Sequence, residues 1–348
     1  MRRGRRIRSG GTSARLRALA IGGVSAVVSL AALAAVPTLD AAAQSRQSEA
    51  TTATTSPVIG AVGDMACDPS DPHFKGGMGT STGCAESTVS SLMLADTSLV
   101  AVLGLGDFQY ACGDPADYAV SYDPTWGRLD PLMDPVAGNH EYQTGKDAFG
   151  KTCPSDNTTA QSYFSHFGAA AHPATGGHFS FDLGTWHLIA LNGNCTRAGA
   201  GGCSASSPQT TWLKQDLAAT RQPCVAAFWH QPLFTGTHED GSAYRPWWKV
   251  LYAAHADLVL NAHIHDFQRY PALDPSGSPD PTRGITQYVV GTGGEGFTDF
   301  VPTIKPKPVL HLQRFGYLRV RLNASGWRAK FIDSTGAVAD NSTGTCHG

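Results

Sequence analysis

Four short apolar runs, each followed closely by an acidic or histidine residue, constrain the fold of this chain most. A short continuous apolar run bounded by Gly or a polar residue is typical of a strand that is buried on both faces. The runs occupy residues 58–62, 99–105, 225–229 and 258–262. They predict buried strands whose ends carry polar side chains.

Helical patterns lie between these runs, at roughly residues 86–95, 207–220 and 245–255. Strands that alternate with helices predict an α/β fold with helices on the faces of a sheet. Further strands are expected from 285 to 333, with a Gly-rich turn at 291–296. Ligands of open α/β sheets bind outside the carboxyl ends of the strands, so we expect the polar residues there to converge on one site.

Five segments carry these polar residues in the order Gly63-Asp64, 106–110 (GDFQY), 138–141 (GNHE), His230 and 263–265 (HIH). Their oxygen and imidazole donors, without thiolates, suit Zn, Fe or Mn. A carboxylate can bridge two such cations, which lower the pKa of bound water and neutralise phosphoryl oxygens. A further histidine can protonate the leaving oxygen. The segments therefore predict a dinuclear metal site for phosphoryl chemistry.

These five segments together resemble the calcineurin-like metallophosphoesterase superfamily, from about residue 57 to residue 333. The Tyr of the G-D-x-x-Y segment is similar to that of the purple acid phosphatases and their bacterial relatives. The resemblance implies a metallophosphoesterase four-layer α/β/β/α sandwich of two mixed β-sheets flanked by helices. It also implies two divalent or trivalent metal ions per chain, Fe together with Fe, Zn or Mn.

The resemblance implies a role for each matching residue. Asp64, Tyr110 and His265 correspond to ligands of the first metal, and Asp107 corresponds to the bridging carboxylate. Many family members have His two positions after the first Asp, where this chain has Ala66. Because Ala cannot bind a metal, the chain departs from the His-using members and is similar to the Tyr-using branch.

For the second metal, the resemblance implies Asn139, His230 and His263 as ligands. His140 corresponds to the residue that lies beside the substrate and assists the leaving group. Substrate contacts are expected from His238, in the loop after His230, and from Glu141.

The expected activity is hydrolysis of phosphomonoesters by a secreted phosphatase, with a metal-bridging hydroxide as the nucleophile and a small phosphorylated molecule as the substrate. Phosphodiester or nucleotide hydrolysis at the same site is an alternative that the motifs do not separate. A non-catalytic binding protein on a decayed phosphatase scaffold is an alternative of another class.

The amino-terminal region has the order of a secretory signal peptide. Seven arginines precede an apolar stretch and Ala41-Ala42-Ala43, so we expect a signal peptide at 1–43 and a flexible linker at 44–56. An uncleaved membrane anchor is the alternative. Cleavage after Ala43 removes seven arginines and one aspartate, which changes the formal charge from −2 to −8. Such an acidic chain without a basic stripe is not expected to bind nucleic acid, nor to stay on a membrane.

The phosphoesterase domain is expected at 57–335 and a C-terminal tail at 336–348. Eight cysteines after a secretion signal are typical of disulfides. The sequence contains no C-x-x-C pair, which argues against a structural zinc knuckle. Sequence does not fix their connectivity. Closeness along the chain favours 67–84, 112–153, 195–203 and 224–346, the last of which would tie down the tail.

Overall fold

The computed structural model describes residues 56–348. The expected signal peptide and nearly all of the expected linker lie outside this range. Within residues 56–348, no helix combines the length and the apolarity needed to cross a membrane.

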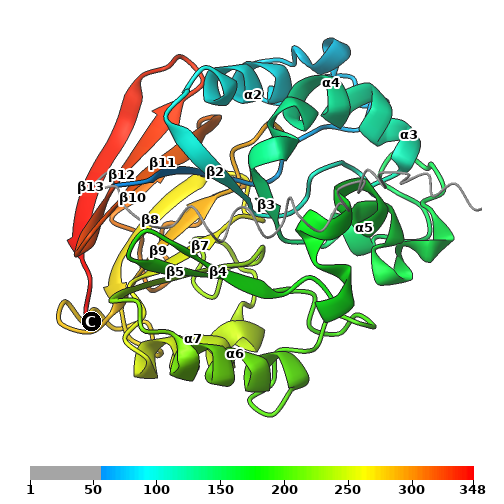
Figure 1. The fold of residues 1–348 in the computed structure, drawn as a ribbon. Helices are drawn as coiled ribbons and strands as arrows, with labels where there is room; N and C mark the ends of the chain where they lie inside the picture. The colour runs from blue at the N-terminus through cyan, green and yellow to red at the C-terminus, as the bar shows by residue number, and fades with distance from the viewer. Residues whose placement is uncertain (1–55) are drawn as a thin grey trace, which may run out of the picture. The chain divides into compact units, whose positions relative to one another are not determined.

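Two mixed β-sheets form the centre of the described chain (Figure 1). The first sheet has the order β13-β12-β11-β1-β2-β3, with β1, β2 and β3 parallel and β11 antiparallel to β1. Its strands are β1 (Val58–Val62), β2 (Leu99–Gly104), β3 (Met133–Pro135), β11 (Gly316–Asn323), β12 (Gly326–Asp333) and β13 (Val338–Thr345).

The second sheet has the order β10-β8-β9-β7-β6-β5-β4, and its central strands β5, β6, β7 and β9 are parallel. Its strands are β4 (Phe179–Leu183), β5 (Trp186–Ala190), β6 (Cys224–Phe228), β7 (Leu258–Asn261), β8 (Phe267–Leu273), β9 (Ile285–Val290) and β10 (Leu310–Leu312). All four predicted apolar runs are strands, and each lies in the buried part of its sheet.

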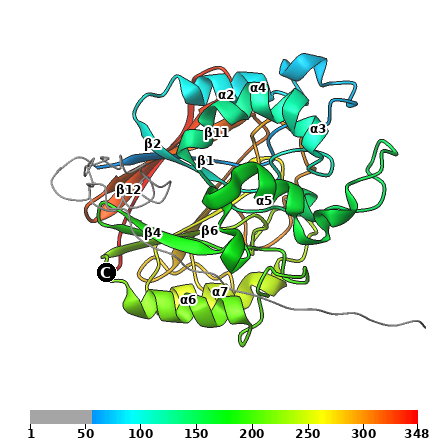
Figure 2. The same ribbon diagram turned by 45° about the vertical axis from the view of Figure 1, so that its right-hand side comes forward.

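Helices cover the outer faces of the two sheets, as the rotated view in Figure 2 also shows. The helices are α2 (Glu86–Leu94), α3 (Pro115–Asp117), α4 (Asp123–Thr125), α5 (Gln161–Phe167), α6 (Pro208–Ala219) and α7 (Arg245–Ala253). The start of α6 is fixed by Ser207, whose side chain accepts the peptide N–H of Thr210, and by Pro208 at the first helical position. The three predicted helices are α2, α6 and α7, so the expected four-layer α/β/β/α architecture is confirmed.

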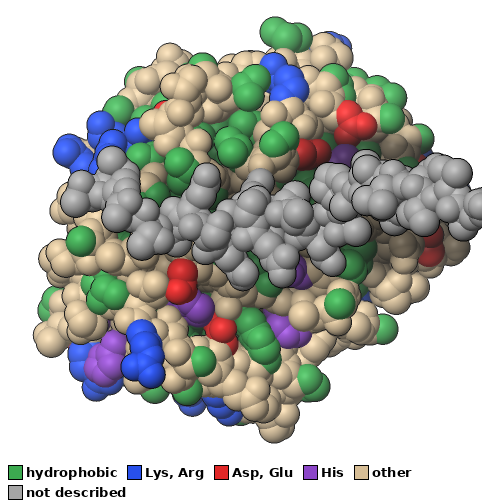
Figure 3. Space-filling view, viewed as in Figure 1, with side chains coloured by type: hydrophobic (Ala, Val, Ile, Leu, Met, Phe, Trp, Pro, Cys, Tyr) green, Lys and Arg blue, Asp and Glu red, His purple; other side chains and the backbone are tan. Residues whose placement is uncertain are grey.

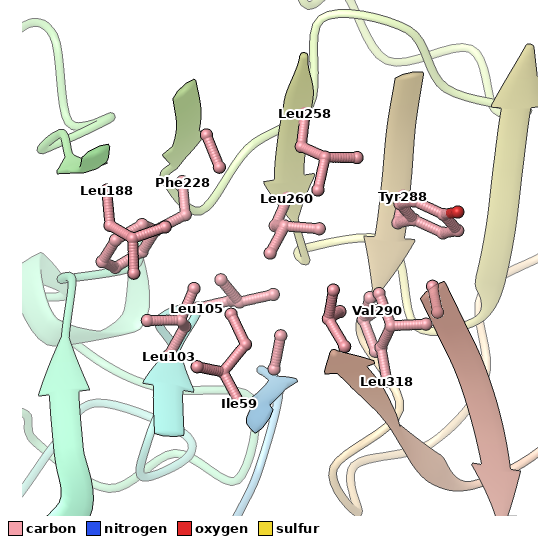
Figure 4. Close-up of a cluster of buried hydrophobic side chains, with 14 of the residues drawn as sticks. Ile59, Leu103, Leu105, Leu188, Phe228, Leu258, Leu260, Tyr288, Val290 and Leu318 are labelled. Carbon is pink, nitrogen blue, oxygen red and sulfur yellow. The ribbon is translucent and has the colours of Figure 1, made fainter. Parts of the chain in front are cut away.

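The space between the sheets is filled by apolar side chains from both (Figure 4). Ile59 and Leu103 of the first sheet face Phe228 and Leu260 of the second, and each of these side chains is almost fully buried. Burial contributes roughly 1.5–3 kcal/mol per large apolar side chain. This shared core fixes the two sheets relative to each other. It therefore also fixes the relative positions of the loops that follow their strands.

Residues 336–348, which the sequence analysis sets apart as a tail, contain strand β13 at the edge of the first sheet. Cys346 forms a disulfide with Cys224 at the start of β6, in the second sheet. The first sheet therefore extends beyond the predicted domain end at residue 335. The strand was missed because its sequence, VADNSTGT, is polar, and only one of its faces is covered.

The disulfides Cys67–Cys84 and Cys195–Cys203 form as expected. The expected pair of Cys112 and Cys153 is wrong for this structure, in which both are buried free thiols. Burial, and next the hydrogen bond to Cys153, raise the pKa of the Cys112 thiol.

The outer face of β11 and β12 carries a basic cluster, which corrects the expectation that the chain has no basic stripe. Arg319 lies opposite Lys330, and Arg321 lies opposite Arg328. All four line a cavity of about 610 Å³ beside α2. Figure 3 shows Lys and Arg side chains gathered at the edge where Figure 1 places these strands. Strand alternation produces the cluster, because residues two apart point to the same face.

Candidate metal centre

The predicted site residues lie at the carboxyl ends of strands from both sheets. Asp64 follows β1, Asp107 follows β2 and Asn139 follows β3, all in the first sheet. His230 follows β6 and His263 follows β7 in the second sheet. The peptide N–H of Gly63 donates to the carbonyl of Val290 across 3.0 Å and joins the two sheets beside this cluster.

Tyr110 is the centre of one group of donor atoms. Its hydroxyl donates to Asp64 Oδ1 across 2.8 Å and lies 3.0 Å from His265 Nε2. His265 Nε2 is in turn 3.3 Å from Asp64 Oδ1. The structure therefore brings together the three residues that the resemblance assigns to the first metal.

His230 is the centre of a second group. Its Nε2 lies 3.1 Å from Asn139 Oδ1 and 3.3 Å from His263 Nδ1. Its Nδ1 donates to the carbonyl of Leu105 across 2.7 Å, which fixes Nε2 as the atom that faces the cluster. These are the three residues that the resemblance assigns to the second metal.

Asp107 lies between the two groups. Its Oδ2 is 3.0 Å from the Tyr110 hydroxyl and 3.0 Å from His230 Nε2. Its other oxygen, Oδ1, accepts the peptide N–H of His140 across 2.9 Å. One carboxylate oxygen thus touches both groups, which is the position that a bridging ligand needs.

Three of the candidate ligands have left-handed backbone conformations, which residues with a Cβ rarely adopt. The φ angles are 57° at Asp64, 53° at Asp107 and 70° at His263. Such conformations cost of order 1–3 kcal/mol each and persist only where the surrounding structure enforces them. They turn each side chain back over the end of its strand, toward the shared space between the sheets.

The loop after β3 approaches the loop after β2 so closely that only glycine fits at 138. A Cβ on Gly138 would lie 2.1 Å from Asp107 Oδ1. Because Gly138 has no Cβ, the two loops can lie in contact, and Asn139 reaches the cluster beside Asp107.

The electrostatics of the cluster are those of buried acids and histidines in contact. Burial alone would raise the pKa of Asp107, but the adjacent positive charge of His230 lowers it well below its usual range. Burial would lower the pKa of His230, and the charge of Asp107 raises it to about 9. His265 behaves in the same way beside Asp64, with its pKa raised to about 9. Asp107 and His230 thus favour each other's charged form, as do Asp64 and His265.

The phenol of Tyr110 has a pKa well above its usual value, because it is buried and lies against the Asp107 and Asp64 carboxylates. A metal cation would reverse this effect, since it would replace the phenolic proton and the imidazolium protons.

The donor set fits a metal pair on the chemistry of its atoms. Seven oxygen and nitrogen donors face one another, they include no thiolate, and carboxylate, imidazole and phenolate suit Fe, Zn or Mn. Among residues 56–348, three groups of residues have the spacing to hold a metal, and two of these contain disulfide-bonded cysteines. The remaining group is Asp107, His230 and His263, whose donor atoms lie within 4.8 Å of one another.

His140 lies at the edge of the cluster and its side chain is 26% exposed. Its Nδ1 donates to the carbonyl of Ala111, and its Nε2 is 3.9 Å from Asp107 Oδ2. The ring also packs on Tyr110, with 4.2 Å between ring centroids. His140 thus faces the cluster with Nε2 and has no role within either donor group.

Glu141 does not lie where the sequence analysis expects it. It is 1% exposed and its carboxylate accepts peptide N–H groups from Asp107, Phe108 and Gly138 at 2.9, 2.8 and 2.6 Å. A group that is buried and saturated in this way does not contact substrate. It fixes the loops after β2 and β3 relative to each other, a role that sequence spacing does not reveal.

His238 is exposed in the loop between β6 and α7, and its role as a substrate contact stays a prediction. The neighbouring Glu239 is the residue that sequence reasoning missed. Its Oε2 lies 2.7 Å from His263 Nε2. Glu239 and His263 are separated by 24 positions in the chain. The one sequence signal that could have indicated Glu239 is the acidic segment 238–240 (HED), which follows soon after His230.

A two-sheet sandwich with this donor set at its strand ends defines a class of protein, the metal-dependent phosphoric ester hydrolases. A family model described as calcineurin-like phosphoesterase matches residues 70–267, which is more than half of the chain. The chain belongs to the calcineurin-like phosphoesterase family.

Curated relatives include purple acid phosphatases 15 and 22 of Arabidopsis thaliana. Each is 26% identical to this chain, over 58% and 64% of it. The matches cover 39% and 54% of those relatives, so the chain spans about half or less of their length. These relatives confirm the resemblance to purple acid phosphatases.

Two solved structures share the fold. The purple acid phosphatase PPD1 from yellow lupin (Lupinus luteus) seeds superposes with a TM-score of 0.66 at 16% identity, over 84% of this chain and 55% of that chain. A dimetal phosphatase from Danio rerio gives 0.55 at 14% identity, over 84% of this chain and 99% of that chain. At these identities the comparison establishes the architecture.

Proposed function

We propose that this chain is a secreted phosphatase that hydrolyses small phosphomonoesters with two metal ions. The observation that carries the proposal is the position of Asp107 Oδ2, which is 3.0 Å from a donor of each group. Asp64, Tyr110 and His265 would hold the first ion, Asn139, His230 and His263 the second, and Asp107 both.

When bound, the ions supply a water molecule that ionises near neutral pH, and they neutralise the phosphoryl oxygens. Iron at the Tyr110 position, with Fe, Zn or Mn as its partner, follows from the phenolate donor. All other steps belong to side chains of this chain.

His140 supplies the proton for the leaving group. Because Nδ1 donates to the Ala111 carbonyl, the ring presents Nε2 to the cluster and carries its transferable proton there. This proton passes from Nε2 to the departing alkoxide oxygen, and the partly exposed ring regains a proton from solvent. Glu141 would hold the loop that carries His140 beside Asp107 through its hydrogen bonds to the peptides of Asp107, Phe108 and Gly138.

Disulfides in the described chain support export, because they persist in oxidising compartments outside the cytosol. The signal peptide proposed at 1–43 would provide it.

Elemental analysis with a visible absorption spectrum tests the metal assignment. We expect about two metals per chain with iron present, and a tyrosinate-to-iron band that Tyr110→Phe removes. Two metals without iron or colour would keep the phosphatase and reject the iron assignment.

Parallel assays on p-nitrophenyl phosphate and bis(p-nitrophenyl) phosphate test the substrate class, with faster turnover expected for the monoester. Faster turnover of the diester would reject the monoester assignment. A protein that binds no metal and hydrolyses neither would be a decayed scaffold.

A further inference from the structure

The two ring nitrogens of His263 contact different parts of the structure. Nδ1 lies 3.3 Å from His230 Nε2, inside the donor cluster. Nε2 lies 2.7 Å from Glu239 Oε2, outside it. His230 is arranged in the same way, with one nitrogen in the cluster and the other on the Leu105 carbonyl at 2.7 Å. Each imidazole therefore has one nitrogen for a cation and one held by an acceptor.

The backbone of His263 is also constrained, but this constraint does not extend to its ring. Its φ angle is 70°, and its peptide N–H donates to Asp64 Oδ2 across 2.7 Å. These features direct the Cα–Cβ bond toward the cluster without fixing the rotation of the ring. The side chain of His263 is 21% exposed, and its ring packs edge-on against His230 with 5.0 Å between centroids, a contact that does not by itself choose between the two flipped orientations of the ring. The contact with Glu239 is the one that sets which nitrogen faces inward.

We propose that Glu239 is a positioning residue for the second metal, which it serves by holding His263 with Nδ1 toward the ion. This inference rests on the proposed metal site. A carboxylate that accepts the outer N–H of a metal-bound imidazole fixes the tautomer and ring orientation and raises the basicity of the ligand nitrogen. Glu239 comes from the loop between β6 and α7, which also carries His230, so this loop would serve the site both through a ligand and through the orientation of His263.

The loop is built to hold Glu239 in place although the side chain of this residue is 50% exposed. Its peptide N–H donates to the hydroxyl of Thr237 across 3.2 Å, and this hydroxyl lies 2.8 Å from that of Thr235. Both threonines are buried. At Gly241 a Cβ would lie 2.3 Å from the carbonyl of Pro232, so the loop closes tightly on its own start.

The opposing interpretation is that Glu239 and His263 form an ordinary surface ion pair. Such pairs contribute little to stability and would contribute nothing to metal binding. Metal affinity therefore separates the two interpretations, whereas the stability of the metal-free protein does not.

The test is a titration of metal-free, full-length protein with Zn²⁺, followed by calorimetry and by competition with a chromophoric chelator. Wild type, Glu239→Ala and Glu239→Gln are compared with Asp240→Asn. This control removes a carboxylate one residue away that bonds only to Ser242, at 2.9 Å. Thermal melting of each metal-free variant shows whether it is folded.

We expect wild type to bind two Zn²⁺ per chain. Glu239→Ala weakens one of the two binding events by roughly 10–100-fold and leaves the other unchanged. Glu239→Gln keeps an acceptor oxygen but loses the charge, so its effect falls between those of wild type and Glu239→Ala. Asp240→Asn binds as wild type does. The Co²⁺-loaded Glu239→Ala protein shows an altered visible spectrum at one site.

Two results would overturn the inference and are distinguishable. If wild type binds two Zn²⁺ and Glu239→Ala binds both equally well, Glu239 does not position the ligand and the proposed function stands. If wild type binds no metal, the proposed function fails and the inference fails with it.

Discussion

The carboxylate of Glu141 accepts the peptide N–H of Asp107 across 2.9 Å, and it also accepts that of Gly138. A single buried side chain thus joins the loop after β2 to the loop after β3. The proposed bridging carboxylate, Asp107, and the proposed proton donor, His140, lie on either side of this contact.

Replacing Glu141 with Gln is therefore expected to destabilise the protein. The amide nitrogen of Gln would face peptide N–H donors, so at least one bond to a charged acceptor is lost. Such bonds contribute about 1.5–3 kcal/mol each, and we expect a loss of about 2–4 kcal/mol in the free energy of unfolding. Urea denaturation measures it, with exposed Asp299→Asn as the control. Equal midpoints for Glu141→Gln and wild type would show that these bonds contribute nothing net.

His140→Ala is expected to lower kcat for the monoester by about 10²–10⁴-fold, the usual contribution of a positioned acid. The number of metals per chain should not change, because His140 belongs to neither donor group. His73→Ala, at an exposed histidine that pairs with Asp71 and with no residue of the site, serves as the control. A fall in metal content that matches the fall in kcat would instead identify His140 as a ligand.

Removal of metal is expected to lower the melting temperature. Asp64 and Asp107 are fully or almost fully buried, and cations that bind only the folded state stabilise it. At a free metal concentration 100 times Kd the gain is about 2.7 kcal/mol. Calorimetric scans with and without a chelator measure it, and Asp107→Asn should lose most of the response. A wild-type protein that melts at one temperature in both conditions would contradict the metal centre.

Loss of the Cys224–Cys346 disulfide is expected to destabilise the protein by about 2–5 kcal/mol. This bond spans 122 residues, whereas Cys195–Cys203 spans 8. Loop-closure entropy predicts that opening the longer loop costs about 2 kcal/mol more. Paired Cys→Ser variants of each disulfide, compared by urea denaturation, test the order. The reverse order would indicate that strain or residual structure dominates over chain entropy.

The stability contribution of His187 should depend on pH. Burial opposes its protonation, but the hydrogen bonds that its ring donates to Asp216 at 2.9 Å and to Asp182 at 2.7 Å raise its pKa above 6.5. A raised pKa gives stability that is complete below 6.5 and is lost as the pH rises through the folded-state value.

His187→Gln should therefore cost more stability near pH 5 than near about pH 9. Denaturation midpoints of variant and wild type at several pH values measure the difference. A difference that grows with pH would reverse the sign and rule out the charged pair.

Much of the fold was predictable because its central strands are buried on both faces. Val58–Val62 and Leu258–Asn261 are short, almost wholly apolar runs, and a residue of the proposed site, Asp64 or His263, follows each of them by two positions. The edge strand Val338–Thr345 was not predictable, since one covered face leaves little apolar pattern. Strand alternation also hid the basic cluster, because Arg319 and Arg321 are separated in sequence by a buried valine.

Within the site, the composition of the donor set was predictable and its surroundings were not. Sequence adjacency placed Glu141 beside His140, but the turn at His140–Tyr142 directs their side chains differently. Glu239 and His263 meet only because two loops of the second sheet converge. The direction of a side chain and the convergence of two loops are properties of the folded backbone, and the spacing of residues in one sequence does not show them.

The donor set is divided between the sheets: Asp64 and Asp107 belong to the first, His230 and His263 to the second. Neither sheet alone holds a complete set for either ion. The first sheet is completed by β13, the last strand of the chain, and Cys346 then links it to β6. Each proposed ion would therefore bind only where both sheets are packed together, and the number of ions per chain in a preparation would report the fraction of molecules that have finished folding.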